Sequence, residues 1–135
     1  MITSNIVYQG NLRVKNTHVK SGNTFLTDAP TDNNGKGEAF SPTDTVATAL
    51  ASCMMTIMGI LAEREDINLV NTEANITKTM ASNPRRISKI EVQFTFPKNY
   101  EDKTKKKLEN AALTCPVLHS LHPDIEKDIQ FIYPS

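Results

Sequence analysis

The sequence contains no tryptophan, only two cysteines, and no excess of charge, since fifteen basic residues balance fifteen acidic ones. A balanced charge argues against nucleic acid or an anionic membrane as the main partner. The N-terminus lacks the basic region and apolar core of a signal peptide, so we expect a cytoplasmic protein. Structural disulfides are rare in that compartment, and two cysteines there are more often reactive, metal-binding or simply packed.

The overall composition is that of an ordinary globular chain, with 39% apolar and 22% charged residues among 135. This length predicts one domain over residues 1–135 with a hydrophobic core of its own. A net charge of zero also tolerates self-association.

The longest uncharged stretch runs from Val46 to Ala62 and holds Cys53 near its middle. It is preceded by Ser41, a good helix N-cap, and by Asp44, which stands where a capping-box acid would be. Spanning a membrane needs about 20 apolar residues, and this run is short and interrupted by hydroxyl side chains. We therefore interpret residues 41–62 as a helix buried in a core.

The other segments predict strands and one further long helix. Residues 4–9, 12–19 and 24–27 form an expected antiparallel meander, and residues 69–80 pair as a hairpin with a strand of alternating polarity at 90–96. A helix is expected over 100–113 and a last strand over 125–133. Because strands and helices are segregated along the chain, the expected class is α+β.

The loop at residues 28–40 connects the meander to the helix that carries Cys53, and it is rich in glycine, proline and asparagine. Loops of this length without structure of their own are uncommon and are often functional.

Cys53 and Cys115 are the residues that could carry chemistry. Cys53 is either a packed core cysteine or a reactive thiol beside small residues. Cys115 either closes the apolar stripe of its helix or caps a short turn that begins at Pro116, where backbone N–H groups favour the thiolate.

The two cysteines lie on the apolar faces of the only long helices, so their sulfurs could meet if these helices pack together. In that case Cys53 would attack an electrophile such as a peroxide oxygen, and Cys115 would condense with the resulting sulfenic acid to a disulfide. A Cys₂His₂ zinc set with His119 and His122 is the alternative, but its spacing is not a common one, and we expect no metal.

The segments FSPTDTVATALASC and AALTCPVLHSL resemble the OsmC/Ohr family of thiol-dependent peroxidases, with GEAFSPTD pointing to an OsmC-like branch. The resemblance covers essentially the whole chain. It implies an intertwined homodimer in which a curved antiparallel sheet surrounds two central helices, with active sites at the dimer interface. It also implies that Cys53 reacts with an organic hydroperoxide and that Cys115 resolves the product.

The resemblance identifies the residues that would activate the thiolate less directly than it identifies the two cysteines. The well-studied peroxidases have a glutamate ten residues before the first cysteine, where this chain has Thr43. Glu38 is a possible substitute for that glutamate. Arg13 is the arginine available in the N-terminal sheet, and His18 is another candidate.

The sequence therefore predicts a thiol-dependent reductase of organic or lipid hydroperoxides that serves oxidative stress defence. The reaction would need a reducing thiol and no bound cofactor. The alternative is a non-catalytic dimer that binds a small hydrophobic ligand at its interface.

Overall fold

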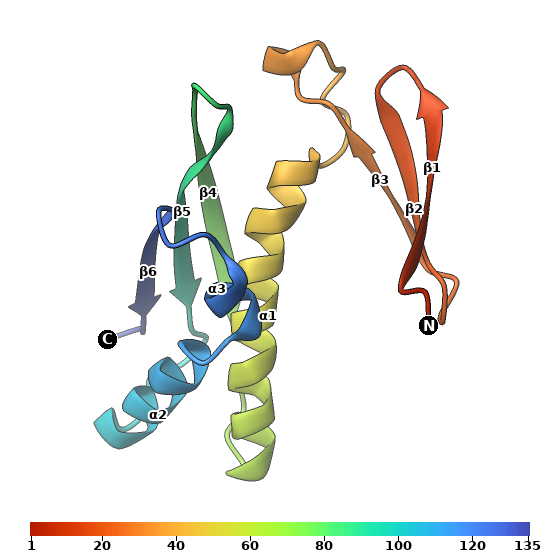
Figure 1. The fold of residues 1–135 in the computed structure, drawn as a ribbon. Helices are drawn as coiled ribbons and strands as arrows, with labels where there is room; N and C mark the ends of the chain where they lie inside the picture. The colour runs from red at the N-terminus through yellow and green to blue at the C-terminus, as the bar shows by residue number, and fades with distance from the viewer. The chain divides into compact units, whose positions relative to one another are not determined.

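A computed structural model describes all residues from Met1 to Ser135, and it divides into two compact units, Met1–Val46 and Ala47–Ser135 (Figure 1). The long helix α1 (Pro42–Arg64) begins in the first unit and runs on into the second. The α+β class is confirmed, because strands and helices occupy separate parts of the chain.

The first unit contains the predicted meander. Strands β1 (Ser4–Gly10), β2 (Arg13–His18) and β3 (Thr24–Asp28) form an antiparallel sheet in the order β1-β2-β3.

The loop after β3 contains a single 3₁₀ turn, η1 (Thr31–Asn33), and is held by backbone hydrogen bonds. The N–H of Asp28 donates to the carbonyl of Phe40 (3.0 Å), and that of Gly37 to the carbonyl of Ala29 (3.2 Å). A side chain at Gly35 would collide with the backbone of Ala29, so glycine is required there. The loop predicted to be functional is thus an ordered segment.

Helix α1 begins with the predicted capping box. The N–H of Asp44 donates to Ser41 Oγ (3.0 Å), and the N–H of Ser41 donates to Asp44 Oδ2 (3.0 Å). These reciprocal bonds satisfy two backbone donors, and Ser41 itself is buried. The helix ends at Arg64, two residues beyond the predicted boundary, where a cation interacts favourably with the helix dipole.

The second unit is built on a mixed sheet in the order β4-β5-β6. Strands β4 (Glu73–Ala81) and β5 (Arg86–Thr95) form the predicted hairpin, although β4 starts four residues later than expected. Residues 69–72 form a turn instead, closed by the N–H of Thr72 on the carbonyl of Leu69 (2.9 Å).

Strand β6 (Glu126–Ile132) pairs with β5 in parallel, a direction that the sequence pattern did not indicate. A parallel pair needs a crossover connection. Helices α2 (Asp102–Ala112) and α3 (Pro116–Ser120) supply it between β5 and β6.

The core of the second unit lies between this sheet and the helices. Its fully buried members come from α1, β5, α2 and the start of α3: Leu50, Met54, Met58, Ile90, Val92, Phe94, Leu108, Ala112 and Cys115. α1 is long and apolar enough to cross a membrane by length and composition alone, a test that the core helix of a globular protein also passes. Its burial against this core agrees with the core-helix interpretation.

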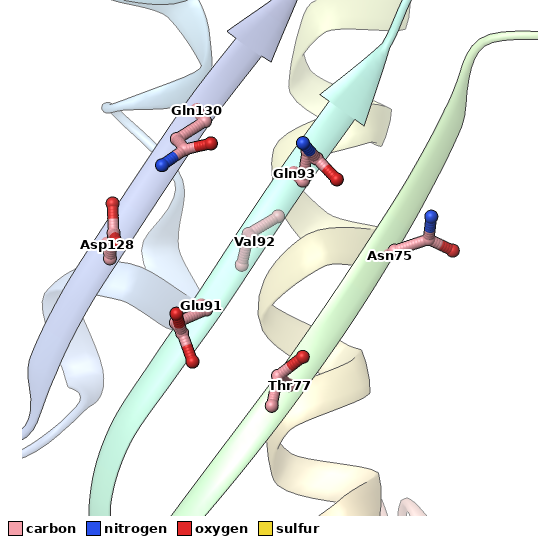
Figure 2. A pocket seen from close by; sticks show the side chains of 7 residues that line it. All are labelled: Asn75, Thr77, Glu91, Val92, Gln93, Asp128 and Gln130. Atoms are coloured by element: carbon pink, nitrogen blue, oxygen red, sulfur yellow. The ribbon is translucent and has the colours of Figure 1, made fainter.

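The opposite face of the sheet is polar. Polar side chains from all three strands line a hollow of about 220 Å³ on that face: Asn75, Thr77, Glu91, Gln93, Asp128 and Gln130. Val92 borders the hollow between Glu91 and Gln93, although its side chain is buried in the core. Figure 2 shows the labelled side chains of β4, β5 and β6 standing over the sheet with α1 behind it. Buried Ile90, Val92 and Phe94 alternate with Glu91 and Gln93, which is the predicted period of two.

We expect Phe94→Ala to lower the free energy of unfolding by about 3–5 kcal/mol, because a fully buried aromatic ring would leave a cavity. Phe94 also stacks on Phe131, with ring centroids 5.4 Å apart. Chemical denaturation monitored by circular dichroism measures the change. Leu113→Ala is the control, since Leu113 is 45% exposed and should cost less than about 1 kcal/mol. Equal losses for the two variants would contradict this description of the core.

Candidate functional site

The structure brings Cys53 and Cys115 together in the second unit. Cys53 lies on α1 and is half-buried, whereas Cys115 is fully buried at the junction of α2 and α3. Both thiols are free, and the neighbouring Cys53 is one of the groups that raise the pKa of Cys115. Two cysteines far apart in the sequence thus belong to one cluster of the second unit, although Cys115 lies after the end of α2 and not on the long helix itself.

Cys115 caps α3, as one of the two readings of the sequence predicted. Its Sγ accepts a hydrogen bond from the N–H of Leu118 at 3.4 Å, and Pro116 occupies the first helical position. Backbone N–H groups of Val117 and Leu118 lower the pKa of the thiol, but its burial and the neighbouring Cys53 raise it more strongly.

The pKa of Cys115 therefore lies above its ordinary value of 9.0, with burial as the largest cause. At neutral pH Cys115 is a protonated thiol, and a protonated thiol is a poor nucleophile. Cys53 is the more exposed of the two, so a reagent from solvent meets Cys53 first.

The surroundings of the two sulfurs are apolar. Met54 and Met58 are fully buried, and Met55, Val117 and Leu118 pack against the same core while remaining partly accessible.

Arg13 and Glu38 lie together in the first unit. Arg13 Nη2 donates to Glu38 Oε1 at 3.3 Å, where the glutamate side chain is 62% exposed.

Arg13 makes its main contact with a residue that sequence reasoning missed. Its Nε and Nη2 donate to Oδ1 and Oδ2 of Asp28 at 2.7 and 2.8 Å, which is a bidentate ion pair. Asp28 stands directly opposite Arg13 in the β2–β3 register. The pairing of the meander strands was predictable, but the register that places these two residues side by side was not.

The remaining candidates, His18 and Thr43, contact residues close to them in the sequence. His18 Nδ1 lies 2.6 Å from Ser21 Oγ in the turn after β2, and Thr43 Oγ1 lies 3.1 Å from Ser41 Oγ in the cap of α1. Thr43 thus belongs to the helix cap and supplies no carboxylate at that position.

The residues of the zinc alternative make other contacts. His119 Nε2 lies 3.1 Å from the carbonyl of Leu113, and His122 Nδ1 accepts a hydrogen bond from the N–H of Asp124 at 3.0 Å. No group of three or more His, Cys, Asp or Glu side chains is arranged to hold a metal ion. The geometry gives the zinc reading no support.

The end of the long loop lines a broad, mainly apolar hollow of about 610 Å³ within the first unit, formed by Phe25, Leu26, Gly37, Glu38, Ala39, Phe40 and Asp44. Glu38 thus contacts Arg13 and also borders a surface on which hydrocarbon can lie.

Comparison with known proteins gives a consistent result. The family model described as OsmC-like protein matches residues 35–130. The crystal structure of a proposed osmotic stress induced and detoxification response protein from Psychrobacter arcticus is 52% identical, with a TM-score of 0.94 over 97% of this chain and 96% of that one. No curated protein matches the chain.

More distant structures share the fold. An organic hydroperoxide resistance protein OsmC from Legionella pneumophila is 12% identical, with a TM-score of 0.75 over 98% of both chains. An organic hydroperoxide resistance protein from Elizabethkingia anophelis is 13% identical, with a TM-score of 0.75 over 99% of this chain and 98% of that one. These identities are low, so these two structures speak for the architecture alone.

We expect iodoacetamide to alkylate Cys53 at least about ten times faster than Cys115 in the native, reduced protein at neutral pH. Cys115 is fully buried and its pKa is raised, whereas Cys53 is partly accessible. Mass spectrometry of the digested protein gives the two rates. In Cys53→Ala the pKa of Cys115 should fall towards its ordinary value, because two of the causes that raise it are removed. Equal alkylation rates for Cys53 and Cys115 in the wild type would contradict the conclusion that Cys53 is the more accessible thiol.

Proposed function

Because the chain belongs to the OsmC-like protein family, we propose that it reduces organic or lipid hydroperoxides with its two cysteines, as part of oxidative stress defence. The observation that supports this proposal best is the pair of neighbouring free thiols, one accessible and one buried, within one apolar cluster. The family match and the similarity to hydroperoxide resistance proteins agree with it.

The first step is attack of the Cys53 thiolate on the outer peroxide oxygen. The O–O bond breaks, a new S–O bond forms, and the alkoxide takes up a proton and leaves as the alcohol. Cys53 is then a sulfenic acid, oxidised by two electrons, and the peroxide is reduced by two. Cys53 is assigned this step because it is the accessible thiol of the pair.

The second step uses Cys115, which already contacts Cys53. Its sulfur attacks Sγ of the sulfenic acid, the S–O bond breaks, and water leaves as the disulfide forms. An external dithiol then restores both thiols by exchange and is itself oxidised to a disulfide. Hydroperoxide and dithiol thus yield alcohol, water and disulfide, with no bound cofactor.

We assign the activation of the thiolate and the orientation of the peroxide to Arg13 and Glu38. A guanidinium stabilises negative charge on sulfur and oxygen, and a carboxylate next to it limits its orientation. Arg13 and Glu38 contact each other within one hydrogen-bonded cluster of the first unit, and the assignment itself follows the family resemblance.

A homodimer is part of the proposal. The first sheet leaves large apolar side chains on its surface, among them Ile6, Val7, Tyr8 and Phe25. Every residue of β1 except Gly10 is exposed, and a three-stranded sheet with uncovered apolar side chains gains little stability alone. A second copy of the chain is the partner that the family leads us to expect there.

Size-exclusion chromatography with light scattering should give a mass about twice the 15.0 kDa of one chain. Replacing Ile6 and Phe25 by serine should shift the protein towards the monomer, because both side chains are more than half exposed and share one face of the sheet through their common neighbour Asn16. A wild-type mass equal to one chain would exclude the dimer.

Titration of the reduced protein with cumene hydroperoxide tests the reaction. We expect rapid loss of two thiols per chain in the wild type and none in Cys53→Ser. Cys115→Ser should lose one thiol and accumulate a sulfenic acid that dimedone traps. Thiols that persist in excess peroxide would reject the enzyme and favour the non-catalytic binding protein, which the apolar hollow beside Glu38 could serve.

A further inference from the structure

The two sulfurs of the cysteine pair differ in how far a molecule from solvent can reach them. Cys115 has an exposed fraction of 0% and is buried in one cluster with Leu50, Met54 and Leu108. Cys53 packs against that cluster but is only half-buried. Contact with a second copy of the chain covers further surface, so the burial of Cys115 within its own chain persists in a dimer.

The oxidised protein of the proposed cycle offers two sulfur atoms to a reducing thiol. Thiol–disulfide exchange begins when a thiolate attacks one sulfur of the disulfide, and the other sulfur then leaves. The attacking sulfur must come within bonding distance of the sulfur that it attacks. At Cys115 this approach requires the core to open, whereas at Cys53 it requires only the access that the proposed peroxide reaction also needs.

The contacts of Cys115 suit a sulfur that leaves. Its Sγ accepts a hydrogen bond from the N–H of Leu118 at 3.4 Å, and such a donor stabilises a departing thiolate. Burial acts against this, because it raises the pKa of Cys115 and a thiol of higher pKa leaves more slowly. That slowing is gradual, but a sulfur without exposed surface is not attacked until the segment around it opens. Access therefore determines which sulfur reacts.

We infer that the reducing thiol attacks Cys53 and not Cys115, so that Cys53 alone exchanges covalent bonds with molecules from solvent. This inference rests on the proposed function and deepens it. The thiolate of the reductant bonds to Cys53 Sγ, the bond between the two cysteines breaks, and its electron pair goes to Cys115 Sγ, which takes up a proton. The second thiol of the reductant then attacks the reductant sulfur bound to Cys53, and Cys53 is released as the reductant leaves as a disulfide.

The position of a trapped mixed disulfide tests this inference. Diamide first oxidises the reduced wild-type protein to the disulfide, so that no peroxide is needed. Glutathione, a monothiol that has no second thiol to release itself, is then added, and acid stops the reaction at an early time. Mass spectrometry of the digested protein shows which cysteine carries glutathione. We expect at least about ten times more glutathione on Cys53 than on Cys115.

The same oxidised protein unfolded in guanidinium chloride is the control, because both sulfurs are then open to attack. The amounts of glutathione on the two cysteines should there agree within about threefold, since the preference comes from the folded core. Glutathione mainly on Cys115 in the folded protein would overturn the inference. So would the same ratio in the folded and the unfolded protein.

A pair of variants tests whether burial is the cause. Leu108 is fully buried in the cluster that contains Cys115, whereas Leu113 is 45% exposed. Leu108→Ala weakens the core and makes its opening more frequent, so the share of glutathione on Cys115 should rise about threefold or more. Leu113→Ala should leave that share within about twofold of the wild type. An unchanged share in Leu108→Ala would overturn burial of Cys115 as the reason for the preference.

Failure of the proposed function would be seen in a different measurement. Wild-type thiols that persist in excess cumene hydroperoxide reject the peroxidase, whereas the position of glutathione identifies the attacked sulfur without any peroxide. A wild-type chain in which diamide forms no disulfide between Cys53 and Cys115 would overturn the inference as well.

Discussion

The packing of α1 against the α2–α3 junction, over one face of the second sheet, brings the two thiols into contact. Leu50, Met54 and Met58 of α1 and Leu108 of α2 are fully buried in this layer, and Cys115 is buried with them. The same burial that raises the pKa of Cys115 also shields it from solvent. Hydrophobic packing thus creates the asymmetry between an accessible thiol and a protected one.

The first unit is held by a bidentate ion pair. There a cross-strand pair, Arg13 and Asp28, joins β2 to β3 and also holds the backbone at Glu38. Bidentate geometry gives this pair directionality, which a single contact between mobile side chains would lack. The long loop is therefore ordered by one carboxylate at its start and by the capping box of α1 at its end.

The chain belongs to the OsmC-like protein family. The 52% identical protein from Psychrobacter arcticus shares the fold over nearly its whole length, and hydroperoxide resistance proteins share the architecture at far lower identity. Thr43, ten residues before Cys53, is part of the helix cap and carries no carboxylate.

Local chemistry made much of this protein predictable from sequence. Alternation at Ile90, Val92 and Phe94 predicted β5, and the capping residues Ser41 and Asp44 predicted the start of α1, because both signals depend only on near neighbours in the chain. The two cysteines were recognisable as candidates because the helix and turn signals around each of them are also local. The sequence left open the parallel pairing of β6 with β5, the register that sets Asp28 against Arg13, and the balance of effects on the pKa of Cys115. Each of these depends on which distant segments pack together and on how much water they exclude, and only the tertiary structure decides that.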